Sequence, residues 1–276
     1  MLKEFAELIR YRELLLNLVV RDIKVRYKNS ILGFFWSLLN PLLQVAMITF
    51  ALRKIMGVDN PNYSAYLLCA FLPWTFFQMS MLDSSMSILL HAGLVKKSYF
   101  PREILPISVV LSNLVHFLLA MGVFFIYMLL RGIPIPASAL LLPVLIFIQL
   151  MFNMGIAFFI SCMNVFYEDI KYLVTVITNL LLFSMPIMFV IETVHYSKTI
   201  PDFLRPWLLG FYNINPLSLL ITAYRKILLP PYNTVTIHDI PLNFGYVWLS
   251  GLISFLVLLA GYAFFNSKKW SFAERL

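Results

Sequence analysis

The side chains that most often perform chemistry in proteins are sparse in this sequence and lie far apart. Its two cysteines, Cys69 and Cys162, both lie inside apolar runs. Its four histidines fall on four different segments: His91, His116, His195 and His238. A metal site needs several such ligands close together, and a disulfide framework needs regularly spaced cysteines. We therefore expect neither a metal centre nor a disulfide scaffold.

Motifs for nucleotide hydrolysis and nucleophilic catalysis are missing as well. The sequence has no G-x-x-x-x-G-K-[ST] phosphate loop, no H-E-x-x-H zinc motif and no G-x-S-x-G nucleophile turn. We therefore do not expect this chain to bind and hydrolyse ATP by that route. A membrane-embedded glycan or lipid transferase stays open, because active sites assemble from distant residues, but no residue pattern favours it.

Two ionisable residues lie inside long apolar segments, Asp83 and His116. A charge is costly within a membrane, so such residues are functional candidates. They leave open an ion-coupled secondary carrier, although a proton-coupled carrier usually needs more such groups. We favour local pairing of Asp83 near the membrane boundary, and we expect His116 to hydrogen-bond a neighbouring helix.

The elements that must position these residues are membrane-spanning helices. Of the 276 residues, 61% are hydrophobic and 12% are charged, whereas soluble domains have about 25% charged residues. A span needs about 20 mainly apolar residues. The sequence predicts an all-α polytopic membrane protein with six spans, at residues 34–56, 66–90, 106–130, 138–165, 172–194 and 246–265.

The distribution of basic residues predicts the orientation of these spans. An even number of spans puts both termini on one side, and that side carries roughly twice as many lysine and arginine residues as the other. Cytoplasmic loops carry such an excess, so both termini are expected in the cytoplasm. Topology thus explains the net charge of +8. We expect no nucleic-acid binding, because no basic module interleaved with aromatic residues is present.

The segment before the first span has the pattern of an amphipathic helix. Five apolar residues recur at steps of three and four along one face: Phe5, Leu8, Leu15, Val19 and Ile23. Polar residues occupy the opposite face: Lys3, Glu7, Arg10, Asn17, Arg21 and Lys24. This pattern predicts a helix in the membrane interface with its basic residues towards the lipid head groups. A simple membrane anchor is the alternative.

The predicted cytoplasmic loop at residues 91–106 mixes charges with apolar and aromatic residues. Leu94, Val95, Tyr99 and Phe100 are expected to be exposed there, and exposed apolar residues rimmed by charge mark a docking surface. Pro101 interrupts a continuous helix, so we expect a short helix followed by an elbow.

The stretch before the last span contains two apolar segments, at residues 203–211 and 216–229, that are too short to cross a membrane. Proline and asparagine residues separate them, as in Asn215-Pro216 and Pro230-Pro231. We expect short re-entrant helices held against the protein, which often line or close a pathway.

Several of these segments, in this order, are similar to those of one known family. The chain resembles the permease subunits of ABC type-2 exporters, which move lipid-linked polysaccharides. The resemblance covers nearly the whole chain and rests on five segments: RYKNSILGFFWSLLNP at 26–41, FLPWTFF at 71–77, VKKSYFPR at 95–102, NVFYEDIK at 164–171 and NPL at 215–217.

The resemblance implies one transmembrane domain over residues 1–276 in a bacterial cytoplasmic membrane. Its parts would be an interface helix at 1–30, spans at 34–194, an extracytoplasmic gate region at 195–245 and a last span at 246–265. Two copies of the chain would pair with two copies of an ATP-binding subunit, which would hold ATP and Mg. The chain itself would need no cofactor. The implied coupling residues are Arg21, Lys24, Arg26, Lys96, Lys97, Tyr99, Phe100, Pro101, Arg102 and Glu103.

The implied substrate is a long glycan or polyol-phosphate polymer on an undecaprenyl-type lipid. Aromatic faces stack on sugar rings, so the expected residues of the translocation path are Phe35, Trp36, Trp74, Phe77 and Tyr212. Aromatic residues also gather at membrane interfaces or face lipid, which is the competing explanation. We favour teichoic acid over O-antigen or capsular chains on the overall resemblance. Arg225, which we also expect at the path, and Lys226 would help by binding its phosphates, although both could instead anchor a helix in head groups.

Overall fold

The computed structural model describes residues 7–8, 10–28, 35–55, 57, 62–197, 200–231 and 238–276, without the side chains of residues 27, 35–38 and 273. This part of the chain is helical and contains no strand, which confirms the all-α prediction. The α-helices are α2 (Arg12–Tyr27), α3 (Phe35–Phe50), α4 (Tyr63–Met86), α5 (Ala92–Lys97), α6 (Ile104–Leu130), α7 (Leu142–Phe166), α8 (Ile170–Ser184), α9 (Ile191–Tyr196), α10 (Arg205–Ile214), α11 (Pro216–Leu228), α12 (Phe244–Lys268) and α13 (Phe272–Arg275).

Four helical segments are long and apolar enough to cross a membrane, and they correspond to the second, third, fourth and sixth predicted spans. Their bounds are Tyr63–Met86, Ile104–Leu130, Ala137–Phe166 and Phe244–Ser271. The first predicted span coincides with α3 and the π-helical turn Ala51–Ile55 that follows it. The total of six spans remains a prediction.

The fifth predicted span, at residues 172–194, is wrong in its extent. Helix α8 ends at Ser184, and Met185 takes an extended conformation with ψ of 155°. Pro186 follows, and a proline disfavours helical geometry in the residue before it. Residues 185–190 form a turn, and the short helix α9 begins after it. The apolar run therefore forms a helix and a turn in place of one continuous span.

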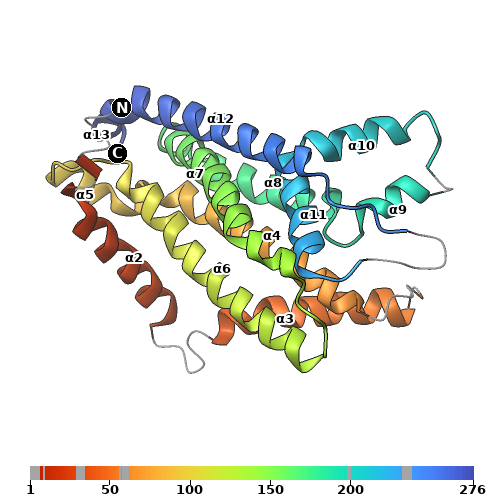
Figure 1. Cartoon of the computed structure of the whole chain (residues 1–276). Helices are drawn as coiled ribbons and strands as arrows, with labels where there is room; N and C mark the ends of the chain where they lie inside the picture. Colours follow the sequence, from red (N-terminus) through yellow and green to blue (C-terminus); the bar gives the residue numbers. More distant parts are fainter. Residues whose placement is uncertain are drawn as a thin grey trace.

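Helix α4 lies at the centre of the bundle, between α3, α6, α7, α8 and α11 (Figure 1). Within its apolar stretch, 78% of the residues are buried inside the chain. Side chains of α4 and its neighbours form the larger apolar cluster of the molecule. The buried Gln149 of α7 donates a hydrogen bond of 2.7 Å to the carbonyl of Pro73. This bond satisfies a polar group in the middle of the apolar core.

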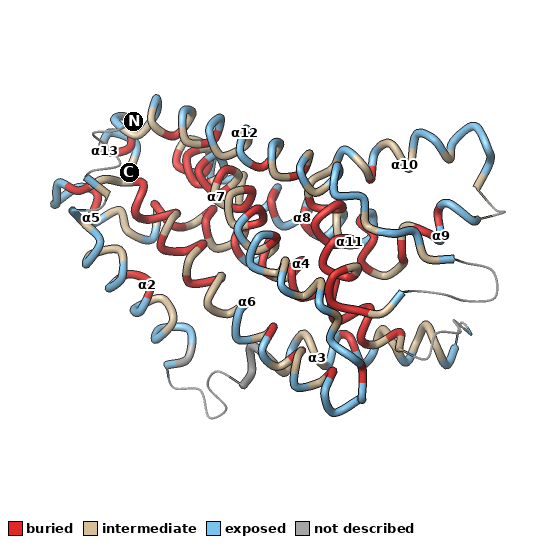
Figure 2. Tube along the Cα trace, viewed as in Figure 1, coloured by how far each residue is buried: buried red, intermediate tan, exposed pale blue. Residues whose placement is uncertain are grey.

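The outer helices remain apolar on faces that no part of the described chain covers. Only 17% of the apolar stretch of α12 is buried, and Figure 2 shows exposed residues along much of that helix. Trp248, Leu252 and Phe255 are among the apolar residues exposed on α12. Exposed apolar faces of this extent are unfavourable in water and favourable in a lipid bilayer. The arrangement is that of a polytopic membrane protein.

Helices α7 and α12 cross at two glycines. A Cβ atom at Gly155 would lie 2.6 Å from the carbonyl oxygen of Val257, and one at Gly261 would overlap the carbonyl oxygen of Gly155. Small residues let two backbones approach closely, which membrane helices use for packing. The two glycines thus set the closest approach of these long helices.

The bundle has two ends, which are made of different elements (Figure 1). The C-terminus lies at one end beside α5 and α13, and we call this the terminal end. The opposite end holds α9, α10 and residues 238–243, and we call it the loop end. A second apolar cluster lies at the terminal end and joins residues of α2, α5, α6, α7, α12 and α13.

Candidate functional site

The amphipathic pattern of the N-terminal segment agrees with the helix that it forms. Leu18 and Val19 of α2 are buried, and α2 packs along α6. Leu8, Leu15 and Ile23 are half-buried on the same side of the helix. The predicted polar residues in the described part are exposed: Glu7, Arg10, Asn17, Arg21 and Lys24. Phe5 and Lys3 lie outside the described residues.

Arg26 is bound by side chains of two other helices. Its guanidinium donates to Asp83 at 2.5 Å and to the side-chain oxygen of Asn113 at 3.0 Å. Asn113 in turn donates to Asp83 at 3.0 Å. These three residues link α2, α4 and α6, so the local pairing predicted for Asp83 is confirmed. The group lies on the wall of a cavity of about 340 Å³ that His116 also lines.

Arg21 and Lys24 lie on the exposed side of α2 at the terminal end. Arg21 pairs with Asp22 at 2.7 Å and contacts the imidazole of His91, which precedes α5. Lys24 makes no ion pair with any described residue. Lys24 therefore leaves positive charge accessible on this side of α2, whereas the charge of Arg21 is paired with Asp22.

The loop between α4 and α6 has the predicted short helix and elbow, but two of its apolar residues are not exposed. Helix α5 ends at Lys97, and the chain turns before Pro101. Tyr99 is 79% exposed, whereas Phe100 is only 7% exposed and Val95 is also buried. The expected exposure of Val95 and Phe100 is therefore wrong. Both pack into the cluster at the terminal end, where neighbouring helices remove them from solvent.

The remainder of this loop is attached to the C-terminal segment. Glu103 is buried and pairs with Lys269 at 2.6 Å, and Arg102 donates to the backbone carbonyl of Lys269. The guanidinium of Arg102 also lies 6.0 Å from the ring of Phe272. The roles of Lys269 and Phe272 were not predictable from the sequence, because these residues lie more than 160 positions from their partners. These contacts hold the elbow at Pro101 against the end of α12.

Lys96 and Lys97 lie at the end of α5 and are both exposed. Neither forms an ion pair with any residue that the structure describes. Trp270, 65% exposed, and Tyr99 line the same pocket of about 220 Å³. The terminal end thus presents lysine and aromatic side chains, held in place by a buried ion pair.

At the loop end, Asn215 and Pro216 begin α11. The side-chain oxygen of Asn215 accepts hydrogen bonds from the backbone nitrogens of Leu217 (3.0 Å) and Ser218 (3.4 Å). Asparagine caps the first turn in this way, and proline suits the first helical position because its missing N–H would have no partner there. The Asn-Pro-Leu segment therefore has a structural role as a helix start.

Arg225 of α11 is buried and surrounded by backbone carbonyls. It donates to the carbonyl of Tyr66 at 3.0 Å, to those of Pro186 (2.8 Å) and Phe189 (2.7 Å), and also to that of Ile187. Burial lowers the pKa of the Arg225 guanidinium from its usual value, while Cys69 and nearby tyrosines oppose this shift. Arginine stays protonated in proteins. Through these hydrogen bonds, Arg225 connects the turn after α8 with α4 and α11.

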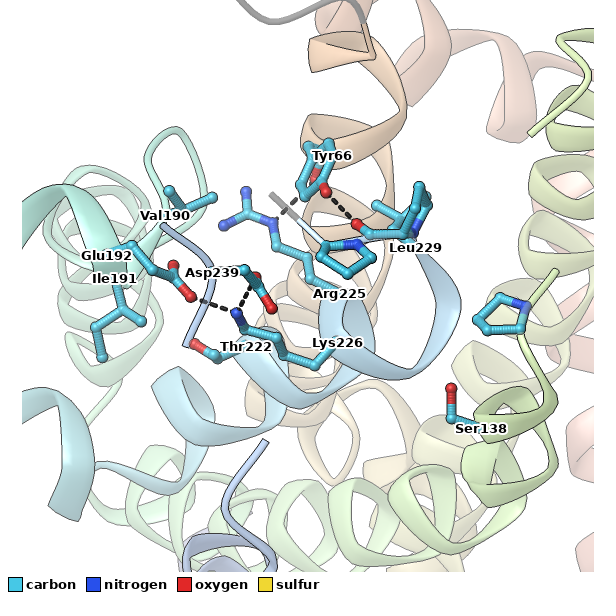
Figure 3. A pocket seen from close by; sticks show the side chains of 13 residues that line it. Tyr66, Ser138, Val190, Ile191, Glu192, Thr222, Arg225, Lys226, Leu229 and Asp239 are labelled. Carbon is cyan, nitrogen blue, oxygen red and sulfur yellow. Dashed lines mark hydrogen bonds and ion pairs between the residues drawn. The ribbon is translucent and has the colours of Figure 1, made fainter. Parts of the chain in front are cut away.

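Lys226 follows on the same helix and lies between two carboxylates, Glu192 of α9 and Asp239 before α12 (Figure 3). Glu192 is buried, and the three side chains line a cavity of about 270 Å³ together with Arg225. The roles of Glu192 and Asp239 were not predicted from the sequence. Both carboxylates lie in the segment before the last span, but their spacing in sequence does not show that they meet at one lysine.

Three of the five aromatic residues predicted for the path are buried in the described part of the chain. Trp74 has no exposed surface, and Phe77 is buried with its ring stacked on Phe152 at 5.9 Å. Tyr212 is buried and donates to the carbonyl of Ser184 at 3.0 Å. Burial raises the pKa of the Tyr212 phenol. The side chains of Phe35 and Trp36 lie outside the described residues, and a path role for all five stays a prediction.

Comparison with known proteins gives a consistent result. Residues 13–229 match the family described as ABC-2 type transporter. The chain is 31% identical over 265 residues to the O-antigen export system permease protein RfbA of Klebsiella pneumoniae, covering 96% of this chain and 95% of that protein. It is 29% identical to the protein of the same name from Myxococcus xanthus, over the full length of both. With this match, the chain belongs to the ABC-2 type transporter family.

Proposed function

We propose that this chain is the membrane subunit of an ATP-driven exporter of a lipid-linked glycan polymer. The observation that carries the proposal is an ABC-2 membrane domain in a chain without a phosphate loop. Such a chain needs a separate ATP-binding subunit as its energy source. In the proposed assembly, two copies of the chain pair with two copies of that subunit, which holds ATP and Mg. Both termini then lie on the cytoplasmic side of the membrane.

The proposed docking surface for the ATP-binding subunit is the exposed part of the terminal end. Lys96, Lys97 and Tyr99 would contact the partner directly, together with Arg21 and Lys24 on α2. Four further residues would support this surface without contacting the partner: Phe100, Pro101, Arg102 and Glu103. Phe100 is buried, and Arg102 and Glu103 are bound to Lys269. Arg26 would connect this end to α4 and α6 through Asp83 and Asn113.

The contacts at the loop end favour a glycan with little charge as the substrate. Teichoic acid is attractive if Arg225 and Lys226 can bind its phosphates. However, Arg225 is bound by carbonyls and Lys226 by two carboxylates. The relatives are named for O-antigen export, which supports the same preference. We therefore propose an O-antigen-like chain on an undecaprenyl-type carrier, with teichoic acid as the alternative.

The first test is purification of the tagged chain from its native membrane in mild detergent, with its partners identified by mass spectrometry. We expect a stoichiometric soluble protein with a phosphate loop. Absence of such a partner from a well-folded sample would contradict the proposal. The matched variants are Tyr99→Ala, which should weaken the partner's association, and Tyr196→Ala, which removes an exposed tyrosine of α9 at the loop end, away from the proposed docking surface.

A second test separates the exporter from an ion-coupled carrier. In vesicles that contain the chain and its partner, export of a labelled glycan should require ATP and should persist after the proton and sodium gradients are collapsed. Transport driven by a gradient without nucleotide would instead favour the carrier. In that case Asp83→Asn should abolish transport.

A further inference from the structure

The loop end contains a cavity that neither the fold nor the proposed docking surface uses. It measures about 540 Å³ and lies between α9, α10, α11 and the beginning of α12. Ligand pockets in proteins are typically about 300–1,000 Å³. The size is therefore sufficient for one or two small rings. Glu192, Thr222 and Lys226 separate it from the neighbouring cavity of Figure 3, because they line both.

Several polar side chains on the wall of this cavity are not used by the protein itself. Asn213 of α10, Thr222 of α11 and Tyr246 of α12 each line it. None of the three makes a side-chain hydrogen bond to any residue in the described ranges. Together they offer an amide, an aliphatic hydroxyl and a phenol from three helices. Such groups can both donate to and accept from a ligand.

The charges at the cavity do not favour an anion. Lys226 is the basic residue on its wall, and it is paired with Glu192 and Asp239. Both carboxylates are already within hydrogen-bond distance of the ammonium group of Lys226, so this lysine is not a free cation. His195 is a further titratable residue on the wall. A ligand with phosphate groups would therefore have to compete with these carboxylates for Lys226, whereas a neutral ligand with hydroxyl groups would not.

The remainder of the wall is apolar and includes Leu209, Leu219, Pro241 and Val247. A cavity with apolar surface and a few convergent polar groups suits a ligand that is itself amphipathic. Sugar rings have this character, because their C–H faces are apolar and their hydroxyls lie at the ring edge. We propose that the cavity binds a saccharide unit of low charge. The assignment to the exported polymer rests on the proposed function.

Protection of a cysteine from a thiol reagent provides the test. Both native cysteines are completely buried, so a new thiol would be labelled above a low background. Leu209→Cys places the thiol in the cavity without removing a polar group, and Trp207→Cys places a control thiol on the exposed surface of the same helix. The full-length chain in lipid nanodiscs is mixed with a free disaccharide such as maltose, with glycerol phosphate, with hexyl glucoside or with hexanol.

We expect the neutral disaccharide to slow labelling of Leu209→Cys and to leave Trp207→Cys unchanged. For a dissociation constant of about 1 mM, roughly 10 mM of the sugar slows labelling about tenfold. Protection by hexyl glucoside alone would support the site and assign it to the sugar next to the lipid. Equal protection by glycerol phosphate would overturn the saccharide assignment. Protection by hexanol alone would show a purely apolar groove and would also overturn it.

Two further variants test the proposed hydrogen bonds. Thr222→Val, in the Leu209→Cys background, should require about three- to tenfold more sugar for the same protection, because one hydrogen bond is lost. Thr193→Val changes an exposed threonine on α9 that does not line the cavity and should have no effect. Equal protection in both variants would contradict the assignment of Thr222.

Failure of this inference can be distinguished from failure of the proposed function. A chain that copurifies with an ATP-binding subunit and exports glycan, but shows no sugar protection, would overturn the cavity assignment alone. A chain that shows protection but has no such partner would overturn the proposed function alone.

Discussion

Two neighbouring pairs of basic residues, one pair at each end of the bundle, differ in their partners. At the loop end, Arg225 and Lys226 are taken up by carbonyls and carboxylates of the protein itself. At the terminal end, Lys96 and Lys97 are exposed and make no ion pair among the residues described. A buried charge without partners is costly, so the loop-end residues serve the fold. An exposed and unpaired charge remains available to a partner protein.

The ends also differ in what holds them together. The loop end depends on hydrogen bonds and ion pairs to short helices and turns, as at Arg225 and Glu192. The terminal end depends on an apolar cluster around Phe272 and Phe265, with one ion pair between Glu103 and Lys269 at its edge. Substitutions can therefore test which residues support each end and which are free for function.

The largest effect is expected at Arg225. Arg225→Met removes three buried hydrogen bonds and one half-buried one to backbone carbonyls, and each carbonyl left unsatisfied costs about 1–3 kcal/mol, so we expect a loss of about 5 kcal/mol or more. The temperature at which the purified protein loses its monodisperse elution in detergent measures this loss. Arg225→Lys retains the charge but has fewer donors, so its stability should lie between that of Arg225→Met and that of the unaltered protein. If Arg225→Met is as stable as the unaltered protein, the arginine does not fasten the loop end.

The next effect tests the apolar cluster at the terminal end. Phe272 is completely buried, so Phe272→Ala should destabilise the protein by about 3–5 kcal/mol through lost burial and a cavity. Trp270→Ala is the matched control, because that residue is 65% exposed and its loss should cost less than about 0.5 kcal/mol. Measuring the thermal stability of both variants in detergent compares their effects. Equal effects of the two substitutions would mean that the cluster does not hold this end.

A single added methyl group where α7 and α12 cross should change the stability of the protein. Gly261→Ala brings a Cβ against the carbonyl oxygen of Gly155, and such overpacking costs about 1–3 kcal/mol. Gly122→Ala, on α6, has open space around the new atom and should stabilise the helix by up to about 1 kcal/mol. The sign of the change in melting temperature should therefore differ between the two variants. The same sign would contradict the close crossing of α7 and α12.

The smallest effect on stability, and the most informative about function, is expected for the exposed lysines. Replacing both Lys96 and Lys97 with alanine should change stability by less than about 0.5 kcal/mol. The same change should lower the amount of ATP-binding subunit that copurifies, and the remaining association should depend less on salt. Copurification at increasing salt concentration measures this. Unchanged association at every salt concentration would remove these lysines from the proposed docking surface.

Phe100 shows how burial changes the design of such tests. From sequence alone it is an exposed docking residue, and Phe100→Ala is the obvious variant. Because its side chain is buried in the terminal-end cluster, that substitution would alter the fold and the docking surface together. Tyr99, its exposed neighbour, separates the two effects.

Local features of this protein were predictable from sequence because they depend on neighbouring residues. Apolar runs predicted the four long helices, and helical periodicity predicted the buried side of α2. Pro101 marked the elbow after α5, and the proline and asparagine residues before the last span marked the short helices α10 and α11. The end of α8 was missed, although Pro186 was the available signal, because apolar character continued beyond it.

The partner of each charged residue, in contrast, was decided only by the tertiary structure. Lys226 meets Glu192 across 34 positions, Arg26 meets Asp83 across 57, and Lys269 meets Glu103 across 166. A sequence reveals that a charge lies in an apolar region and therefore needs a partner. It does not reveal which distant residue the fold brings to it. The sequence by itself thus determined the membrane-embedded helices, and the packing of those helices decided which basic residues remain free to act.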